Sequence, residues 1–243
     1  MQNSLYLDLM EKCLTGMIYG DAPQDWWNSG EYNPVIREEG KDWPSFAHSM
    51  IGLKRMRNLR ELCERVIAEN IPGDFIETGV WRGGAVIMMR AVLKANGISD
   101  RNVWCADSFE GLPKPDEASY PQDAGDVHHT FKPLAISQED VRANFAKYEL
   151  LDEQVKFLKG WFKDTLPFAP IEKLAILRLD GDMYQSTIEA LNALYDKLSL
   201  GGFVIIDDFA LPGCHKAVLD FRIMRDIGNP IHRIDSIGAY WQK

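Results

Sequence analysis

Cysteine is scarce in this chain of 243 residues, and its four cysteines lie far apart in the sequence. No two of them form a Cys-x-x-Cys pair, and their density is too low for the disulfide framework of a small secreted domain. The pattern therefore excludes a disulfide scaffold and a cysteine-bound zinc site. We expect reduced thiols, typical of a cytoplasmic protein, at Cys13, Cys63, Cys105 and Cys214.

Long apolar runs are also missing. The purely apolar stretches span only a few residues, whereas a membrane helix needs about 20. The first 20 residues contain acidic side chains and lack the basic region followed by an apolar region that marks a secretory signal. We find no internal repeat and no low-complexity tract, and we expect neither a membrane span nor a secretory leader.

Positive charge is in deficit. The 27 lysines and arginines face 36 aspartates and glutamates, which gives a formal net charge of −9. Such a surface repels phosphate backbones, so a nucleic-acid partner is disfavoured. With 46% hydrophobic and 26% charged residues the composition is that of a globular protein, and the length suits one large domain or two small ones.

The chain up to residue 70 has a helical pattern around an aromatic loop. Apolar residues recur at helical spacing from Ile51 to Ile67, and Pro72-Gly73 end the pattern. We interpret the basic residues of this helix as a solvated face; they are Lys54, Arg55, Arg57 and Arg60. In the preceding loop we expect the tryptophans to anchor the core, with stacking against a sugar as the alternative: Trp26, Trp27 and Trp43.

From Asp74 onward, short apolar strands alternate with helices of about a dozen residues. This alternation is typical of a doubly wound, mostly parallel α/β sheet with helices on both faces. We predict seven strands, at residues 74–78, 102–107, 154–158, 173–180, 202–207, 231–235 and 239–242. We predict helices at residues 83–95, 137–148, 184–198 and 214–225.

Ligands of such sheets bind beyond the carboxyl ends of the strands, near the point where the strand order reverses. Residues that directly follow the predicted strands are therefore candidates for a binding site. The first five predicted strands end in Glu77-Thr78-Gly79, Asp107-Ser108, Gly160-Trp161, Asp180-Gly181-Asp182 and Asp207-Asp208. Carboxylates occur at four of these five ends, which indicates a polar, acid-rich site.

A glycine turn from Glu77 to Gly84 joins the first predicted strand to its helix. Glycine lets the backbone turn tightly and lets a ligand approach it closely. The spacing differs from the dinucleotide fingerprint, because Trp81 and Arg82 would crowd a pyrophosphate. Asp107, at the end of the second strand, is well placed to accept hydrogen bonds from ribose hydroxyls. A purely structural turn is the alternative interpretation.

Asp180, Asp207 and Asp208 end two apolar strands that we expect to be neighbours. Carboxylates crowded at one edge repel each other, which raises their pKa values. A hard divalent cation removes that conflict, and an all-oxygen ligand set favours Mg²⁺ or Ca²⁺ over zinc. The alternative is that these acids cap the following helices, which suits Asp182 before Tyr184 but explains the Asp207-Asp208 pair poorly.

These motifs resemble those of the class I S-adenosylmethionine-dependent methyltransferases. The match is closest to the macrocin O-methyltransferase family, which methylates sugar hydroxyls of antibiotics, and it extends from about Asp42 to the C-terminus. The segments that carry the resemblance are Asp42 to Pro44, Ile71 to Asp74, Glu77 to Gly84, Ala106 to Pro113, Leu158 to Pro167, Leu179 to Tyr184 and Ile206 to Asp208.

The resemblance implies a seven-stranded, Rossmann-like catalytic domain at residues 71–243, and an extension at residues 1–70 with lid or dimer contacts. It implies that the methionine moiety of the cofactor is held by Glu77, Thr78 and Gly79. The ribose would be held by Asp107 and Ser108, and the adenine packed by Gly160 and Trp161. The implied metal ligands are Asp180, Asp207 and Asp208, with Asp182 as the general base. A homodimer is expected by the same analogy.

The expected chemistry follows from the acceptor, because a sugar hydroxyl is a poor nucleophile at neutral pH. A metal that binds two neighbouring hydroxyls lowers the pKa of one and aims its oxygen at the methyl group, and Asp182 takes the proton. We expect a Mg²⁺-dependent O-methyltransferase that uses S-adenosylmethionine and acts on a vicinal diol of a glycosylated natural product. The alternatives are a nicotinamide-dependent oxidoreductase and a non-catalytic nucleoside- or sugar-binding module with a structural cation.

Residues 108–134 form a long segment with four prolines and little periodicity. Segments of this length in compact domains are mostly functional lids or disordered. We interpret its two histidines, His128 and His129, as exposed loop residues, with contact to the substrate or the base as the alternative. His215 follows the last acidic strand end, and we do not expect it to be catalytic.

Overall fold

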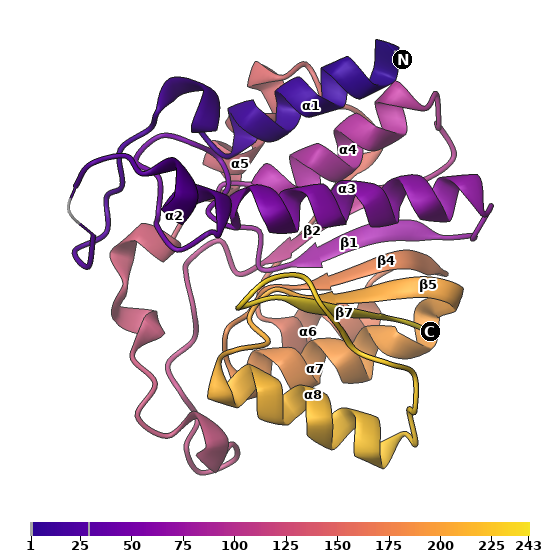
Figure 1. Ribbon diagram of the computed structural model, residues 1–243. Coiled ribbons are helices and arrows are strands. Elements are labelled where there is room, and N and C mark those ends of the chain that lie inside the picture. Colours follow the sequence, from indigo (N-terminus) through magenta and orange to yellow (C-terminus); the bar gives the residue numbers. More distant parts are fainter. Residues whose placement is uncertain (1, 29) are drawn as a thin grey trace.

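The computed structural model describes residues 2–28 and 30–243, and within them seven strands form one sheet (Figure 1). The strands lie in the order β3-β2-β1-β4-β5-β7-β6. Neighbours among the first five are parallel, whereas β7 is antiparallel to both β5 and β6. Their bounds are β1 Asp74–Thr78, β2 Val103–Asp107, β3 Val155–Lys159, β4 Leu174–Leu179, β5 Leu198–Ile206, β6 His232–Arg233 and β7 Ala239–Gln242.

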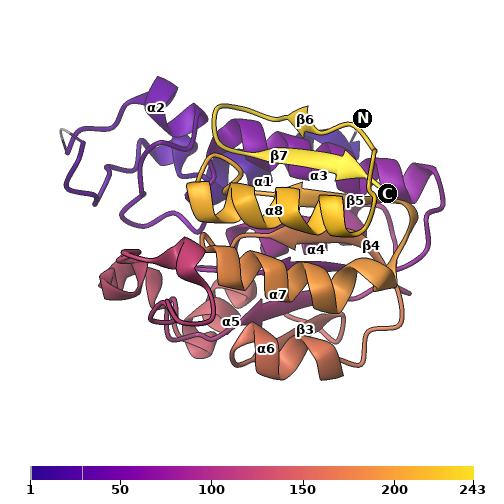
Figure 2. The ribbon, with the colours of Figure 1, turned by 90° about the horizontal axis from the view of Figure 1, so that it is seen from below.

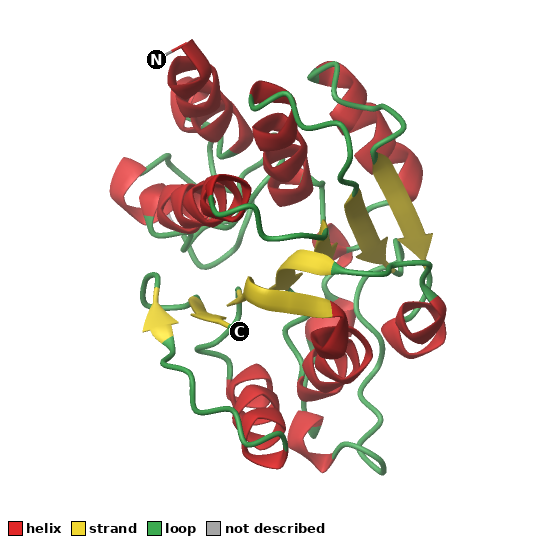
Figure 3. Ribbon diagram, turned by 90° about the vertical axis from the view of Figure 1, so that its right-hand side faces the viewer, coloured by secondary structure: helices red, strands yellow, loops and turns green. Residues whose placement is uncertain are grey.

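Helices cover both faces of the sheet, as Figures 2 and 3 show. One face packs against α1 (Gln2–Leu14), α3 (Gly52–Ala68), α4 (Gly84–Ala95) and α5 (Gln138–Lys147). The other packs against α6 (Phe162–Thr165), α7 (Tyr184–Leu194) and α8 (Pro212–Met224). The short helix α2 (Pro34–Glu38) lies in the N-terminal loop. None of the helices in the described ranges is long and apolar enough to cross a membrane.

Helix α4 explains why the N-terminal helices belong to the main core. All its residues from Gly84 to Leu93 are buried, and a helix that is apolar on every side must be covered on every side. The sheet covers one side, while α1 and α3 pack on the other. Residues of the predicted extension 1–70 therefore share one hydrophobic cluster with β1 and β2.

The predicted α/β fold with a doubly wound, mostly parallel sheet is confirmed, including all seven strands. The largest difference is at β5, which begins at Leu198 rather than at residue 202, so the preceding helix ends at Leu194. Gly201 and Gly202 interrupt the apolar run before Phe203, so the sequence pattern did not predict the first half of the strand. The pairing with β4 shifts register at the same place.

The sheet also fixes where a ligand can bind. Strands β1 and β4 are neighbours at its centre, and the chain proceeds from β1 toward β3 on one side and from β4 toward β5 on the other. The strand order therefore reverses between β1 and β4. Because β1 to β5 are parallel, all five carboxyl ends meet at one edge, which is the usual place for a ligand.

Candidate active site

A cleft of about 560 Å³ lies at that edge, a volume within the range of small-molecule sites. Apart from the strand ends, its walls include the N-terminal loop, residues 108–134, the first turns of α6 and α7, and the turn before β7. The predicted site residues that line it are Gly79, Asp107, Ser108, Gly160, Trp161, Asp180, Asp182, Asp207 and Asp208. The other two, Glu77 and Thr78, are buried in β1 behind the cleft.

Gly79 stands where β1 and β4 end side by side. Its φ is +87°, and a Cβ atom at this position would lie 1.7 Å from the carbonyl oxygen of Asp180. The backbone nitrogen of Gly79 donates a hydrogen bond of 2.8 Å to the carbonyl of Ala106 on β2. Glycine is required here both by conformation and by space, and the turn brings bare backbone to the floor of the cleft.

Asp107 ties the glycine turn to the loop after β2. Its Oδ2 accepts a hydrogen bond from the Val80 nitrogen, and its Oδ1 accepts one from the Phe109 nitrogen, both 2.7 Å long. Burial raises the pKa of Asp107, while these backbone donors act in the opposite direction. The Ser108 hydroxyl also lies 3.4 Å from Oδ1, so several donors fix the carboxylate at the end of β2, the position at which a ribose-binding acid stands in such sheets. The Ser108 hydroxyl shapes the same loop by donating to the Gly111 carbonyl at 2.6 Å.

Backbone strain is concentrated around the cleft. Three non-glycine residues within three positions of a strand end have positive φ: Trp81 at 45°, Phe109 at 57° and Asp182 at 59°. In the described part of the chain, the others are Asn70, Glu149 and Asp226, which sit just beyond helix ends, where this conformation is routine. Residues held in sparsely populated conformations at strand ends are typical of functional sites.

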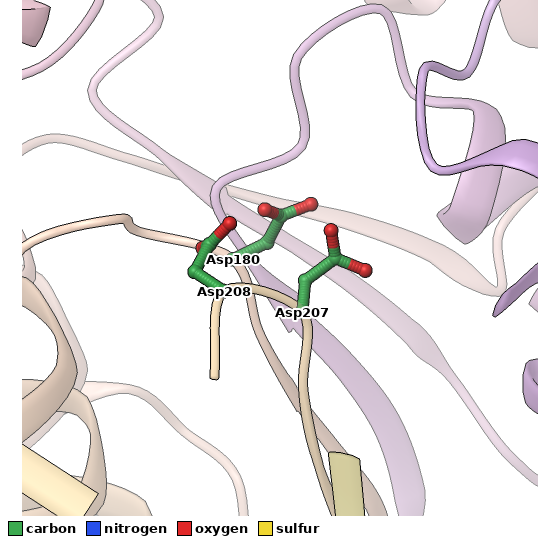
Figure 4. A group of neighbouring side chains, drawn as sticks. All are labelled: Asp180, Asp207 and Asp208. Atoms are coloured by element: carbon green, nitrogen blue, oxygen red, sulfur yellow. The ribbon is translucent and has the colours of Figure 1, made fainter. Parts of the chain in front are cut away.

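The three predicted metal ligands are brought together by β4 and β5. Figure 4 shows Asp180, Asp207 and Asp208 with their carboxylates pointing to the same side, and one oxygen of each lies within 4.8 Å of the others. Burial, followed by the negative charge of Asp207, raises the pKa of Asp180 to about 6. Burial and the neighbouring carboxylates also raise the pKa of Asp208 well above its ordinary value.

Arg178 is a site residue that sequence reasoning missed. It lies on β4 with its side chain buried, and it donates to Asp180 Oδ2 at 2.7 Å and also to Glu77 and Asp207. Burial raises the pKa of Glu77 to about 8, and its second oxygen has no hydrogen-bond partner. The sequence did offer a signal, a single charged residue inside an apolar strand. Because a buried charge must be paired, it indicates an acidic partner nearby.

The expectation of a solvated basic face on α3 is wrong for Arg55. Its side chain is only 6% exposed and donates to Asp207, one of the predicted metal ligands. Arg60 is also largely buried, against Asp8 and Glu11 of α1. Lys54 and Arg57, by contrast, are about half exposed. The arginines at 55 and 60 point toward partners that are distant in sequence.

Asp182 lies beside the three carboxylates, and its backbone nitrogen donates a hydrogen bond of 3.0 Å to Asp208 Oδ2. Burial, followed by the charge of Asp180, raises the pKa of Asp182 to about 7. The capping alternative is wrong, because Asp123 caps α7 with hydrogen bonds from the Tyr184 and Gln185 nitrogens at 2.7 and 2.9 Å. Helix α8 has no side-chain cap at its N-terminus.

Two loops meet above the cleft through an aromatic rim, which we define as Trp26, Trp27, Trp43 and Phe131. The rings contact edge to face, with centroids 4.8 Å apart for Trp26–Trp27, 4.9 Å for Trp27–Trp43 and 5.2 Å for Trp26–Phe131. Core anchoring is wrong for Trp26 and Trp27, whose exposed fractions are 68% and 47%. Trp27, Trp43 and Phe131 line the cleft, where rings can stack on a ligand.

The three histidines considered in the sequence analysis fall in different places. His128 lines the cleft, half-buried, with its Nδ1 2.7 Å from Asp126 Oδ2, so the exposed-loop interpretation is wrong for it. His129 is exposed, as expected. His215 stacks on Phe209 at a centroid distance of 4.6 Å and lies outside the cleft lining. Contact with a ligand is therefore open to His128.

The strand order, the antiparallel final strand and the cleft at the reversal point define a class: the S-adenosylmethionine-dependent methyltransferases with a Rossmann-like sheet. Within that class, the chain belongs to the macrocin-O-methyltransferase (TylF) family, whose model matches residues 3–243. It is an O-methyltransferase, and not the nicotinamide-dependent oxidoreductase or the non-catalytic module considered as alternatives.

Two curated relatives illustrate the family. The chain is 54% identical over 240 residues to the 8-demethyl-8-(2,3-dimethoxy-alpha-L-rhamnosyl)-tetracenomycin-C 4'-O-methyltransferase of Streptomyces olivaceus, covering 98% of this chain and 92% of that protein. It is 51% identical over 249 residues to the demethyldecarbamoylnovobiocin O-methyltransferase of Streptomyces niveus, covering 99% and 94%.

Solved structures agree with this assignment. The O-methyltransferase NovP matches with a TM-score of 0.95 and 52% identity, covering 99% of both chains. The calicheamicin methyltransferase CalS11 matches with a TM-score of 0.59 and 19% identity, covering 78% of this chain and 79% of that one. At that identity the second match shows a shared fold alone.

Proposed function

We propose that this chain transfers a methyl group from S-adenosylmethionine to a hydroxyl of a sugar in a glycosylated natural product, in a Mg²⁺-dependent reaction on a vicinal diol. The observation that carries the proposal is the meeting of Asp180, Asp207 and Asp208 with Asp182 in one cleft. A sugar acceptor is supported by the tetracenomycin relative, which is named for a rhamnosyl-bearing compound.

The residues present fit a hard divalent cation. The donor atoms are all carboxylate oxygens, the ligand type that Mg²⁺ prefers. Arg178 pairs with Glu77, Asp180 and Asp207, and Arg55 pairs with Asp207 and Asp235. These carboxylates, together with the adjoining Asp182 and Asp208, outnumber the two guanidinium groups, and a divalent cation with a sulfonium group would offset part of the excess negative charge.

The cleft also fits the three parts of S-adenosylmethionine. Gly79 offers bare backbone for the methionine part. Glu77 and Thr78 support this turn from within β1, where the Thr78 carbonyl accepts a hydrogen bond of 2.9 Å from the Asp180 nitrogen. Asp107, which lines the cleft at the end of β2, accepts from the ribose hydroxyls. Gly160 and the partly exposed indole of Trp161 provide a surface against which the adenine packs.

The bound cofactor supplies an electrophilic methyl group, and a bound cation lowers the pKa of a hydroxyl beside it. Asp180, Asp207 and Asp208 hold the cation. Asp182 accepts the proton of the attacking hydroxyl, because its carboxylate adjoins this cluster and its backbone is fixed by Asp208. The rim residues Trp27, Trp43 and Phe131 cover the cleft, orient the acceptor and limit the access of water.

Chelation tests the metal requirement. Removal of divalent cations is expected to abolish methyl transfer to a glycosylated acceptor, and Mg²⁺ to restore it, with the product identified by mass spectrometry. Asp180→Ala is expected to be inactive, whereas Asp100→Ala, at an exposed acid before β2, is expected to match the wild type. Turnover that survives chelation, or an active Asp180→Ala, contradicts the proposal.

We also propose a homodimer in which residues 1–70 supply lid or subunit contacts. Exposed apolar side chains on α1 and the turn after it support this proposal; they are Leu5, Leu9, Ile18 and Tyr19. Sedimentation of the purified protein is expected to give the mass of two chains, and a monomer at micromolar concentration refutes it.

A further inference from the structure

One guanidinium group joins three separate parts of the chain at the wall of the cleft. Arg55, on α3, donates from Nη1 to Asp207 at the end of β5. Its Nε donates to Asp235 Oδ2 in the turn before β7, and its Nη2 donates to the carbonyl of Gly40 in the N-terminal loop, both at 3.1 Å. Every arm of the guanidinium group is therefore used.

Arg55 and Arg178 hold the Asp207 carboxylate from its two sides. Arg178 donates to Oδ1 and Arg55 to Oδ2, and the side chains of both arginines are nearly inaccessible to solvent. The plane of the carboxylate is thus set by two rigid donors, and each oxygen keeps a free lone pair. Hydrogen bonds of this kind orient ligands around metal ions and tune their affinity.

The surroundings of Arg55 are shaped to fit an arginine. A Cβ atom on Gly40 would lie 2.4 Å from Arg55 Nη2, and one on Gly238 would lie 2.9 Å from Arg55 Cδ. The side chain of Asp235 is fully buried, and its Oδ1 accepts from the Ile237 and Gly238 nitrogens at 2.8 and 2.7 Å. The space around the Arg55 side chain is therefore bounded by two glycines and contains a fixed anionic partner.

We propose that Arg55 is a positioning residue, which sets the Asp207 carboxylate for cation binding and couples the cation site to the Gly40 loop and the 235–238 turn. The inference rests on the Mg²⁺ site of the proposed function. An occupied site fixes Asp207, Asp207 fixes Arg55, and Arg55 holds the two covering segments. Charge alone does not do this, because a lysine ammonium lacks the planar fork that reaches three acceptors at once.

The test compares Arg55→Lys with Arg57→Lys, the same change on the same helix at a half-exposed side chain. Calorimetric titration with Mg²⁺ is expected to give a dissociation constant roughly 10–100-fold weaker in Arg55→Lys, and unchanged in Arg57→Lys. In the metal-free proteins, amide hydrogen exchange near Gly40 and at residues 235–238 is expected to be faster in Arg55→Lys alone.

The outcomes separate the two proposals. A wild-type protein that binds no Mg²⁺ refutes the metal of the proposed function, while the exchange rates still test the coupling of the segments. A wild type that binds Mg²⁺ and an Arg55→Lys variant that binds it equally tightly refute the positioning role. If Arg55→Lys does not fold, Asp235→Asn is tested in its place. The amide nitrogen of this variant is a hydrogen-bond donor facing Arg55 Nε, so the contact with Arg55 is lost. Unchanged Mg²⁺ affinity in Asp235→Asn would also refute the positioning role.

Discussion

At the scale of single residues, Asp182 combines an unusual backbone with a buried carboxylate. Its φ of 59° is maintained because its nitrogen is bonded to Asp208, whose backbone carbonyl in turn receives the Leu211 nitrogen at 2.8 Å. The side chain is thereby held beside the proposed cation ligands without capping α7. A residue held in this way against its own conformational preference is suited to a task that depends on placement.

Replacing Asp182 by Asn removes the proposed proton acceptor while leaving the shape of the side chain nearly unchanged. We expect kcat to fall by about 10²–10⁴-fold, the usual contribution of a general base, with the affinity for S-adenosylhomocysteine close to that of the wild type. Steady-state kinetics and calorimetry measure the two quantities. Turnover equal to the wild type would remove Asp182 from this role.

Gly79→Ala tests the close approach of β1 and β4. The new Cβ would lie 1.7 Å from the Asp180 carbonyl oxygen, whereas a Cβ on Gly97, where φ is +66°, would enter open space with nothing within 4 Å. We expect Gly97→Ala to lower the free energy of unfolding by about 1–2 kcal/mol, because only the left-handed backbone opposes it. We expect Gly79→Ala to lower it by about 2–5 kcal/mol, because the steric clash adds to the same backbone cost. Denaturant unfolding compares them, and equal losses contradict the steric argument.

Some of these residues were predictable from sequence and others were not, for a physical reason. Asp180 and Asp207 follow apolar strands directly, so the pattern that predicts the strand also predicts the position of the acid. Arg55 meets Asp207 and Asp235 across 152 and 180 residues of chain, and α3 shows no spacing that reports such partners. Arg178 was visible as an isolated charge, but its partners were not.

At the scale of elements, helix α7 lacks an N-terminal cap of its own. Its N-cap position is Met183, whose side chain forms no capping bond, and Asp123 supplies both missing acceptors from the distant 108–134 segment. The cap therefore fastens this segment to the layer of helices beneath the cleft. Periodicity predicted α7 but not its cap, because the capping residue lies outside the helical sequence.

Asp123→Ala is expected to destabilise the fold by about 0.5–2 kcal/mol through loss of the cap, and to loosen residues 108–134. Ser137→Ala is the matched control, because Ser137 caps α5 by accepting from the Asp140 nitrogen at 3.1 Å. Limited proteolysis within 108–134 is expected to accelerate in Asp123→Ala alone. Equal cleavage in both variants would show that the cap does not fasten the segment.

The regular elements and the irregular segments differ in how well sequence predicts them. Strands β1 to β4 carry their own periodicity and flanking turns, which is why they were placed closely. The segment 108–134 has three short 3₁₀ turns, Pro121–Asp123, His128–Thr130 and Lys132–Leu134. None follows a repeating pattern, and two of them have distant partners: Asp123 contacts α7, and the Pro133 carbonyl accepts from the Trp81 indole. The N-terminal loop is likewise fixed by contacts that no periodicity reports, because the buried Arg37 donates to the carbonyls of Thr15 and Asp21 as well as to Asp42.

At the scale of the whole molecule, the excess of negative charge is unevenly distributed. The formal net charge is −9, and the carboxylates of β4 and β5 are concentrated at one edge of the sheet, where burial raises the pKa values of Asp180 and Asp208. Repulsion at this edge opposes folding in the absence of a cation. Ligand binding and stability are therefore linked.

Magnesium is expected to raise the melting temperature. At a concentration 100 times its Kd, a ligand specific for the native state adds about 2.7 kcal/mol, which corresponds to a rise of roughly 5–10 °C for a chain of this size. Calorimetry with MgCl₂, and with NaCl at equal ionic strength as the control, measures the effect. Equal shifts in the two salts, or a full shift in Asp180→Ala, contradict a specific site.

The aromatic rim has a consequence for how such a protein can change. Trp27, Trp43 and Phe131 are carried by two segments that contribute no strand to the sheet, while the residues proposed for chemistry sit at strand ends. Substitutions in the rim therefore alter the mouth of the cleft without moving the reaction centre. A combinatorial library confined to these three positions would therefore test new acceptors at low risk to the fold. The rim is the part of this scaffold that is most open to redesign.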